Sequence, residues 1–523
     1  MIPPLGPSRP VARERGRRPA RAAALGLLAG LLGGCAPHPA ASSGALGISV
    51  PYEVDTLDPH AHNTLSNFSM ASNFYESLVT TDADMRIRPA LARLWENPDP
   101  STWTFHLQQG VTFHSGKPFG ADDVVYTMRR LMTSPDLEMT SYVLYITDVT
   151  AIDPLTVRIR STAPVSTFLN KLRFVSVVPK GARDEDLAVR PDGTGPYILA
   201  EWSKGRSIRM RRNERYREPA GLPAEVVFLL DRAPEQAVKD PMESRSKLVQ
   251  CRSRKAEAAL QEAGRFRVVR RPGIFTKYMA FDMGRDVTPF VAGRPNPFKN
   301  PLVRRAMNIA IDRKRLVEGL SQAAVPANQP VPPSIFGFNP DLPVPAHDLS
   351  AARGLLEKAG LKDGFAVTLH VRKLFAEAAF LVQGQLREVG IQVTVKPLPD
   401  EEFLASLSRR EYSLFLSRFG CPTGDASEIL DTALHSFDPA KKMGLSNDQG
   451  YANPEVDRAI EASARIDGLQ ARGEALREVM AKLMEDVAWI PLYVDEDVYA
   501  MDRTLAWEPR NDSFILAAEA TVR

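Results

Sequence analysis

The chain has 523 residues, of which 44% are hydrophobic and 25% are charged, a composition typical of packed globular proteins. Residues 1–34 hold six arginines and one glutamate, whereas the rest of the chain has 60 basic residues against 62 acidic ones. The formal net charge of +3 therefore comes from residues 1–34. This balance gives no support for nucleic-acid binding, and no later apolar run reaches membrane-spanning length. The remaining chain exceeds the roughly 250–300 residues of a single core, so we expect two or three lobes.

Residues 1–34 have the features of a lipoprotein signal peptide. Six arginines precede an apolar segment from Ala22 to Gly34, and small residues lead directly to Cys35. This segment is shorter than the roughly 20 residues that span a bilayer. We therefore predict cleavage before Cys35, lipidation of Cys35 and a flexible tether over residues 35–46, with folded structure beginning near Leu46. The alternative is an accidental Ala/Leu/Gly run beside a free cysteine.

The first half of the chain predicts a mixture of strands and helices. Alternating apolar and polar residues indicate strands at Trp103–Leu107, Leu155–Arg160 and Ser207–Arg211. Ala121–Met132 carries apolar residues at helical spacing, and Asp122 and Asp123 stand at the start of that helix, where carboxylates are favoured.

The second half alternates helices and strands more regularly. Asn300, Asp312 and Ser350 are predicted to cap three helices, the last of which ends at Gly360. The segments that follow are strand Phe365–Val371, helix Ala376–Val389, strand Ile391–Lys396, helix Glu401–Ser408 and strand Ser413–Ser417. Short links between alternating elements predict a parallel α/β sheet, which binds ligands beyond the carboxyl ends of its strands.

The loop predicted after the last of these strands, Arg418–Asp425, is therefore the best candidate for ligand contact. It combines an aromatic ring, two glycines, a guanidinium and a carboxylate, all suited to line a binding cleft. The competing interpretation is an ordinary surface turn.

Sequence motifs for catalysis or metal binding are sparse. There is no Gly-x-Ser-x-Gly elbow, Walker loop or His-Glu-x-x-His sequence. His60 and His62 have a spacing that can chelate a transition metal, but without an evident third ligand a solvent-facing turn is the default interpretation. Cys251 and Cys421 can either form one disulfide outside the cytoplasm or stay free.

Several blocks together resemble the family-5 extracellular solute-binding proteins, which include oligopeptide-, dipeptide- and nickel-binding receptors of ABC importers. The strongest block is residues 90–131, ALARLWENPDPSTWTFHLQQGVTFHSGKPFGADDVVYTMRRL. Others, in chain order, are TLDP (56–59), GTGPY (193–197), RRAMNIAID (304–312), LLEKAG (355–360), LREVGIQV (386–393), GYANPEVD (450–457) and IPLY (490–493).

The resemblance implies a two-lobed periplasmic-binding-protein fold of the α/β class, with α+β structure in the first lobe. Lobe I would comprise residues 47–75, 191–285 and 490–523, lobe II residues 286–489, and an inserted small domain residues 76–190. A lipid-anchored, monomeric receptor in the periplasm or cell envelope would then capture a small solute, a peptide or amine-containing compound, and hand it to ABC permease subunits. Neither catalysis nor a cofactor is expected. The alternatives are a metal or metal-chelate receptor for nickel or haem, and a hydrolase on this scaffold.

This chain departs from the family pattern at two places. Peptide-binding relatives carry an aromatic residue followed three positions later by an aspartate that pairs with the peptide ammonium. Here Phe419 matches the aromatic residue, but Pro422 stands in place of the aspartate, so either Asp425 substitutes or the ligand is not an ordinary peptide. The segment Asp240–Lys255 also differs from the expected Gly-Glu-x-Asp strand. The candidate ligand contacts are Phe419, Asp425, Tyr493, Arg418, Cys421 and Asn63.

Overall fold

A computed structural model describes residues 45–231, 246–291, 295–466 and 468–523. Cys35, the signal peptide, most of the tether and the first part of the irregular segment 240–255 lie outside these ranges. The first described strand, β1 (Leu46–Ser49), begins where folded structure was expected, and all four of its residues are buried. No described helix combines the length and apolar character that crossing a membrane requires.

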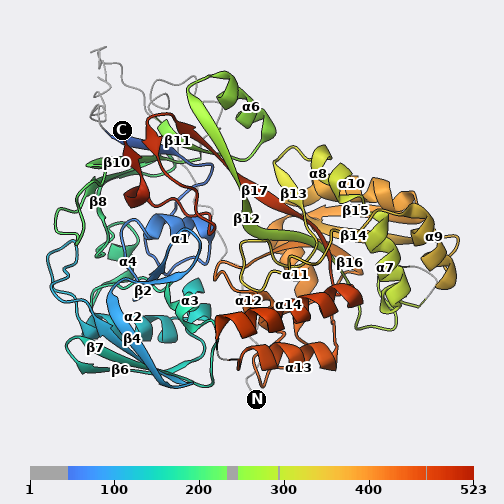
Figure 1. Cartoon of the computed structure of the whole chain (residues 1–523), viewed down its shortest axis with the longest axis horizontal. Helices are drawn as coiled ribbons and strands as arrows, with labels where there is room; N and C mark the ends of the chain where they lie inside the picture. Colours follow the sequence, from blue (N-terminus) through green and yellow to red (C-terminus); the bar gives the residue numbers. More distant parts are fainter. Residues whose placement is uncertain (1–44, 232–245, 292–294, 467) are drawn as a thin grey trace, which may run out of the picture. The chain divides into compact units, whose positions relative to one another are not determined.

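A large mixed sheet extends through the described chain (Figure 1). Two long strands, β12 (Phe266–Phe281) and β17 (Ile490–Asp502), lie antiparallel at its centre. On one side follow β16 (Leu414–Gly420), β14 (Phe365–Arg372) and β15 (Ile391–Leu398). On the other side follow β11 (Ser246–Cys251), β1, β10 (Glu225–Leu229), β9 (Ser207–Arg212) and β8 (Tyr197–Ser203), while β13 (Ala324–Pro326) pairs with β17.

The α/β part of this sheet confirms the parallel arrangement predicted for the second half. β14 pairs in parallel with both β15 and β16. The helices of this region are α7 (Pro301–Ala310), α8 (Arg313–Gly319), α9 (Leu349–Lys358), α10 (Ala376–Arg387) and α11 (Asp400–Ser408). Asn300 and Asp312 cap α7 and α8 as expected, because each side chain accepts a hydrogen bond from a backbone N–H of the first turn.

Two local predictions in this region were wrong. Ser350 does not cap α9: Asp348 does, its carboxylate accepting a 2.8 Å hydrogen bond from the Ala351 N–H. Residues 418–420 are strand rather than loop, because β16 continues to pair with β12 as far as the Phe275–Gly420 pair. The turn after this strand therefore begins at Cys421.

A second sheet with the order β4-β5-β7-β6 lies in the first half of the chain. Its strands are β4 (Ala92–Asp99), β5 (Thr102–Leu107), β6 (Ile146–Asp153) and β7 (Thr156–Ser161), and α2 (Ala121–Thr133) packs on β6 and β7 (Figure 1). The predicted strands and helix are confirmed here. Asp123 holds the helix start, since its carboxylate accepts a hydrogen bond from the Gly120 N–H at 2.9 Å.

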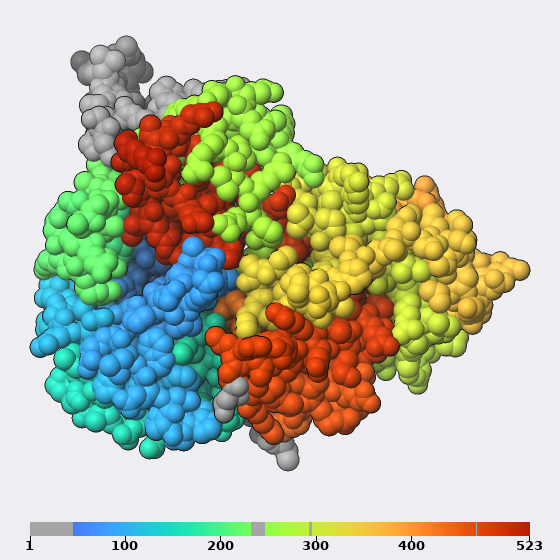
Figure 2. All heavy atoms as spheres, viewed as in Figure 1, coloured from blue at the N-terminus to red at the C-terminus, as the bar shows by residue number. Residues whose placement is uncertain are grey.

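The other α-helices and strands lie between or after the elements already named. They are α1 (Leu65–Ala71), β2 (Val79–Thr81), β3 (Ile87–Pro89), α3 (Phe168–Leu172), α4 (Asp184–Leu187), α6 (Arg254–Glu262), α12 (Ser427–Ile429), α13 (Pro454–Ser463), α14 (Leu469–Asp486), β18 (Leu505–Ala506) and β19 (Thr521–Val522). In Figure 2 the yellow residues near position 340 lie next to the orange-red residues of α14, and the Asn339 side-chain amide donates to the Arg477 carbonyl at 3.0 Å.

The Gly193-Thr194-Gly195 sequence has a steric explanation. A Cβ atom on Gly195 would lie 2.6 Å from the carbonyl carbon and oxygen of Phe74, and one on Gly193 would collide with the same carbonyl. The Gly195 N–H donates to the Phe74 carbonyl at 2.9 Å. Glycine is therefore required because two backbone segments touch here.

The hydrophobic core is divided into several clusters. One fills the four-stranded sheet and α2, with Phe105, Val124 and Met128 at its centre. Separate clusters lie around β14 and α10, around α14, and around β1 and β10. The exact domain boundaries given above stay a prediction.

Candidate functional site

A pocket of about 220 Å³ lies beside the end of β16, where the α/β rule predicts a ligand. It brings together three of the predicted site residues, Asn63, Arg418 and Phe419. The other lining residues are Leu65, Phe68, Tyr142, Ile274, Phe275, Gly420, Pro422 and Glu428.

Arg418 and Phe419 supply one wall of the pocket from β16. The exposed Arg418 guanidinium stacks on the Phe275 ring at 4.7 Å and forms no ion pair with any described residue. The Phe419 ring is half-buried and lies 6.2 Å from the ring of Trp489, which in turn stacks on Tyr278 at 3.5 Å. The pocket therefore offers an aromatic surface backed by rigid packing, with a cation beside it.

Asn63, just before α1, and Tyr142, just before β6, also line the pocket. The Tyr142 hydroxyl donates a hydrogen bond to the Asn63 side-chain oxygen at 3.2 Å. The Tyr142 ring packs against Phe68 and Phe174, with centroid distances of 5.8 and 5.1 Å. Phe68 of α1 and Phe174 after α3 thereby position the Tyr142 ring, and the Tyr142 hydroxyl holds the Asn63 side chain.

Glu428 in α12 is a pocket residue that the sequence did not reveal. Its Oε2 accepts hydrogen bonds from the Thr423 hydroxyl at 2.6 Å and the Thr423 N–H at 3.1 Å, while Oε1 has no partner among the described residues. Burial raises the pKa of Glu428 to about 7, against the lowering effect of the Thr423 hydrogen bonds and of Lys171. The pocket thus contains a carboxyl group that can gain or lose a proton near neutral pH.

Asp425 does not line this pocket. Its Oδ2 and Oδ1 accept hydrogen bonds from Arg472 of α14 at 2.7 and 2.9 Å, and both side chains are almost fully buried. The Ser427 N–H donates to Oδ1 as well. The predicted contact between Asp425 and a ligand cation stays untested, but this ion pair already uses both oxygens of the carboxylate.

Tyr493 and Cys421 are also absent from the pocket lining. Each is only 1% exposed and belongs to a hydrophobic core cluster. Burial raises the pKa of the Cys421 thiol well above its ordinary value. Cys251 and Cys421 do not form a disulfide with each other. The ligand contacts proposed for Tyr493 and Cys421 remain predictions.

The two histidines considered as metal ligands are held by protein groups. His60 is fully buried, so the solvent-facing turn expected for it was wrong: its Nε2 donates to the Ser176 carbonyl at 2.8 Å, and its Nδ1 accepts from Arg130. His62 contacts Asp55 and Glu138 instead. Among the described residues, no group of three or more His, Cys, Asp or Glu side chains is arranged to hold a metal ion.

Comparison with solved structures defines the class of fold. The chain is similar to HbpA2 from Haemophilus parasuis, with a TM-score of 0.80 and 20% identity over 92% of this chain and 100% of that one. It is also similar to the periplasmic binding protein DppA from Helicobacter pylori in complex with the peptide STSA, with a TM-score of 0.75 and 22% identity over 92% and 98% of the two chains. The described fold is that of the two-lobed periplasmic binding proteins.

Sequence comparison then gives the family. Residues 86–441 match the family described as "Bacterial extracellular solute-binding proteins, family 5 Middle". A curated relative, the glutathione-binding protein GsiB of Salmonella paratyphi A, is 28% identical over 503 residues, which cover 91% of this chain and 94% of that protein. This chain belongs to the family-5 extracellular solute-binding proteins of ABC importers, as the sequence resemblance indicated.

Proposed function

We propose that this protein captures a small solute with a positively charged amine, a peptide or related compound, in the Arg418–Phe419–Glu428 pocket and delivers it to an ABC permease. The observation that carries the proposal is the composition of this pocket: it brings together an aromatic surface, a carboxyl group and a guanidinium, and neither charged group forms an ion pair with a described residue. A zwitterionic solute complements both charges.

Glu428 supplies the carboxylate for the ligand ammonium, a role that Pro422 cannot perform. It reaches the pocket from α12, six positions after the proline, and Thr423 fixes only one of its two oxygens. Oε1 is therefore available to accept a hydrogen bond from a ligand ammonium. Asp425 is the weaker candidate for this anchor, because a ligand would have to compete with the buried Arg472 guanidinium.

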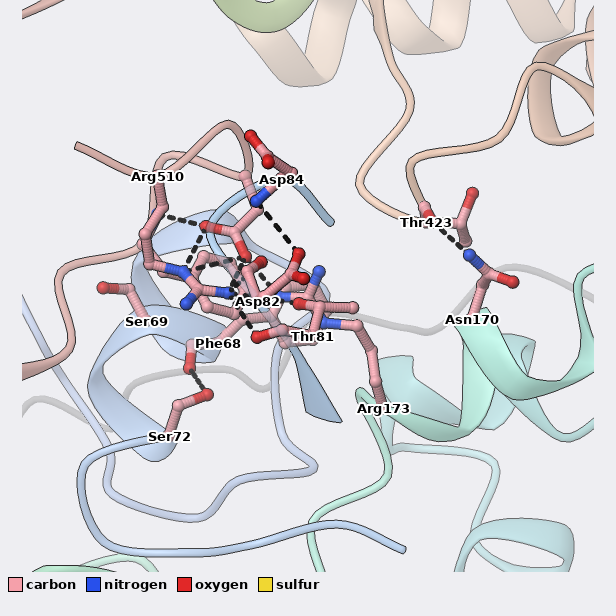
Figure 3. A network of polar contacts seen from close by, with 12 residues as sticks. Phe68, Ser69, Ser72, Thr81, Asp82, Asp84, Asn170, Arg173, Thr423 and Arg510 are labelled. Carbon is pink, nitrogen blue, oxygen red and sulfur yellow. Dashed lines mark hydrogen bonds and ion pairs between the residues drawn. The ribbon is translucent and has the colours of Figure 1, made fainter. Parts of the chain in front are cut away.

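Closure of the two lobes around the solute supplies the signal that the permease recognises. The Asn170 side chain, after the start of α3, donates to the Thr423 carbonyl at 2.8 Å, so the segment 76–190 contacts the turn after β16 beside the pocket (Figure 3). The pocket volume is below the 300–1,000 Å³ usual for small-molecule sites. A peptide-sized ligand therefore requires a more open arrangement on entry, and contacts with both sides then favour closure.

The remaining parts of the proposal concern location. Cleavage before Cys35 and lipidation of its thiol would tether a monomeric binding protein to a membrane in the periplasm or cell envelope. The role requires solute binding and release, without bond chemistry. Mass spectrometry of protein extracted from membranes, compared with a Cys35→Ser variant, tests the anchor: an acylated N-terminal cysteine is expected, and an intact residue 1 on membrane-free protein would contradict it.

The binding test uses isothermal titration calorimetry with defined probes. Glutathione is the first probe because a curated relative binds it, and a tripeptide and its N-acetylated form test the need for an amine. We expect binding of at least one amine-bearing probe, loss of affinity on acetylation, and a weakening of about 1.5–3 kcal/mol in Glu428→Gln. Glu402→Gln, at an exposed position in α11, is the matched control. Equal binding of the acetylated and free tripeptides would contradict the proposed ammonium anchor.

A further inference from the structure

The end of the large sheet at which β1 starts brings together distant parts of the sequence. Because β1 is parallel to β10 and β11, all three strands start at this end. β9 and β17 run antiparallel to β10 and β11, so their last residues lie at the same end. In Figure 1 the C-terminus is marked near β10 and β11, and the Arg523 N–H donates to the Thr504 carbonyl, just after β17, at 2.9 Å. The described chain therefore enters the fold beside its own last residues.

Three basic residues surround the turn after β17. Lys247 of β11 donates from Nζ to the Thr504 hydroxyl at 2.8 Å, and Arg503 donates from Nε to the Gly264 carbonyl at 3.4 Å. Arg523 is held at the same turn by its backbone hydrogen bond to Thr504. Arg503 and Arg523 are exposed and Lys247 is half-buried, and none of the three forms an ion pair with a described residue. Their charges are therefore directed to solvent or to a partner.

Arg211 adds a cation on the other side of β1. It stands near the end of β9 and pairs in register with Glu225 at the start of β10. The next pair of strands places Leu46, the first residue of β1, beside Val226. Arg211 is exposed and forms no ion pair within the described part of the chain. Basic side chains thus flank the start of β1 on both sides.

The acidic groups at this end do not cancel these charges. Asp502, Glu225 and Glu214 each form an ion pair with another arginine, at 2.8, 2.7 and 2.9 Å. The carboxylate of the C-terminal residue and the exposed Glu262, at the end of α6, are the other negative groups of the described segments named here. Four cations without an ion pair face these two negative groups, so an excess of positive charge remains.

The chain that precedes β1 indicates which partner this end of the sheet meets. Cys35, the proposed lipidation site, stands 11 positions before Leu46. An extended chain covers at most about 3.6 Å per residue, so a lipid on Cys35 would keep the start of β1 within about 40 Å of the bilayer. Anionic headgroups attract basic side chains that come within roughly one Debye length, about 10 Å, of the membrane surface. A membrane is therefore the charged surface that this end of the fold meets most often.

We propose that Lys247, Arg211, Arg503 and Arg523 form a docking surface for a bilayer of anionic phospholipid. Contact between these side chains and the headgroups would hold the folded part in one orientation on the membrane that carries the anchor. The choice of partner rests on the proposed lipid anchor, whereas nothing in the inference depends on the solute pocket.

The test measures sedimentation of the protein with vesicles. It uses the chain from residue 35 with Cys35→Ser, which cannot be acylated, so that binding depends on the folded part. Vesicles of phosphatidylglycerol and phosphatidylcholine in equal parts are compared with vesicles of phosphatidylcholine alone. At low ionic strength we expect binding to the anionic vesicles only, and its loss at about 0.3 M salt, where charges are screened. Lys247→Glu/Arg503→Glu should lower the partition coefficient at least about tenfold.

A matched double variant separates this surface from net charge. Lys358→Glu/Lys362→Glu changes two exposed lysines at and after the end of α9 and should bind almost as the wild type does. Equal binding to neutral vesicles, no binding to anionic ones, or an equal loss in both double variants would overturn the proposal. The comparison of vesicles and salt with the wild type decides even if a variant misfolds. Failure of the anchor would appear separately, as an unmodified Cys35 in mass spectrometry.

Discussion

Asp425 and Arg472 form a two-point ion pair in the interior, with N–O distances of 2.7 and 2.9 Å and side-chain exposures of 6% and 8%. They stand 47 positions apart, one in the turn after β16 and the other in α14. The pair thereby links the turn beside the pocket to α14. Asp425, which the sequence predicted to contact the ligand, therefore has Arg472 as its structural partner.

The first prediction concerns this pair. Asp425→Ala leaves the buried Arg472 charge without a partner, and we expect the free energy of unfolding to fall by about 3–5 kcal/mol in urea denaturation. Asp286→Ala, which breaks an exposed pair with Lys299, should leave the free energy of unfolding nearly unchanged. A stable Asp425→Ala protein with weakened ligand binding would instead support the role of Asp425 as the ligand anchor.

The second prediction concerns the pH dependence of ligand affinity. Burial raises the pKa of Glu428 to about 7, and a ligand ammonium binds the ionised carboxylate. Affinity for an amine-bearing ligand should therefore be full above pH 7 and fall by up to about tenfold per pH unit below it. Calorimetry between pH 5.5 and 8 measures the effect, with a ligand whose own charges do not change in that range.

Asp431 provides the control for this titration. Burial raises its pKa to about 7 as well, but it does not line the pocket. Both carboxyl groups interact with Lys171 and Asp425, so removing the Asp431 charge alters the surroundings of Glu428. Glu428→Gln should flatten the affinity profile, whereas Asp431→Asn should mainly move its midpoint. An unchanged profile in Glu428→Gln would refute the assigned role.

The third prediction concerns stability in mild acid. Burial and Arg130 lower the pKa of His60 to about 4, so the unfolded chain takes up this proton before the folded one does. The contribution of His60 is fully present above pH 6.5 and should be lost by on the order of 3 kcal/mol between pH 6.5 and 4. Urea unfolding of wild type and His60→Gln at several pH values measures the difference, which should shrink as the pH falls.

The comparison with the variant is essential here. The raised pKa values of Glu428 and Asp431 act in the opposite direction, because these groups favour the folded state as pH falls from 7 towards 4.5. Only the difference between wild type and His60→Gln isolates the histidine. A difference that does not vary with pH would contradict the prediction.

The fourth prediction concerns Met85, in the turn between β2 and β3. It has a left-handed backbone, with φ of 65°, and its buried side chain packs in the cluster around α14, where Gly424 leaves room for it. If the proposed closure forms this contact, Met85→Ala should weaken ligand binding several-fold and increase the radius of gyration of the liganded protein in small-angle scattering. Met132→Ala, at an exposed methionine, should change neither.

The elements predicted best from the sequence are those set by local chemistry. Asn300 and Asp312 were identified as helix caps because a side-chain oxygen three or fewer residues from its partner needs no tertiary information. Ser350 was predicted as a cap and Asp348 was not considered, although serine and aspartate are both good caps and the two positions lie close together. The extension of β16 to Gly420 was missed because its partner, β12, lies far away in the sequence.

The site was predictable to the same limited degree. Arg418 and Phe419 follow from the rule that ligands bind at strand ends, and that rule requires only the strand assignment. Glu428 was missed because it enters the pocket only when the turn 421–426 folds back. The burial of Asp425 was equally invisible, since the sequence does not disclose that Arg472 returns to meet it.

The position of β17 in the large sheet has a consequence for biosynthesis. This strand lies between β12 and β11, yet it is synthesised long after both of them. Until residues 490–502 have been made, β12 and β11 each lack a neighbour and the two halves of the sheet cannot join. A nascent chain of this protein must therefore carry β11 and β12 with edges unpaired until synthesis has passed residue 502.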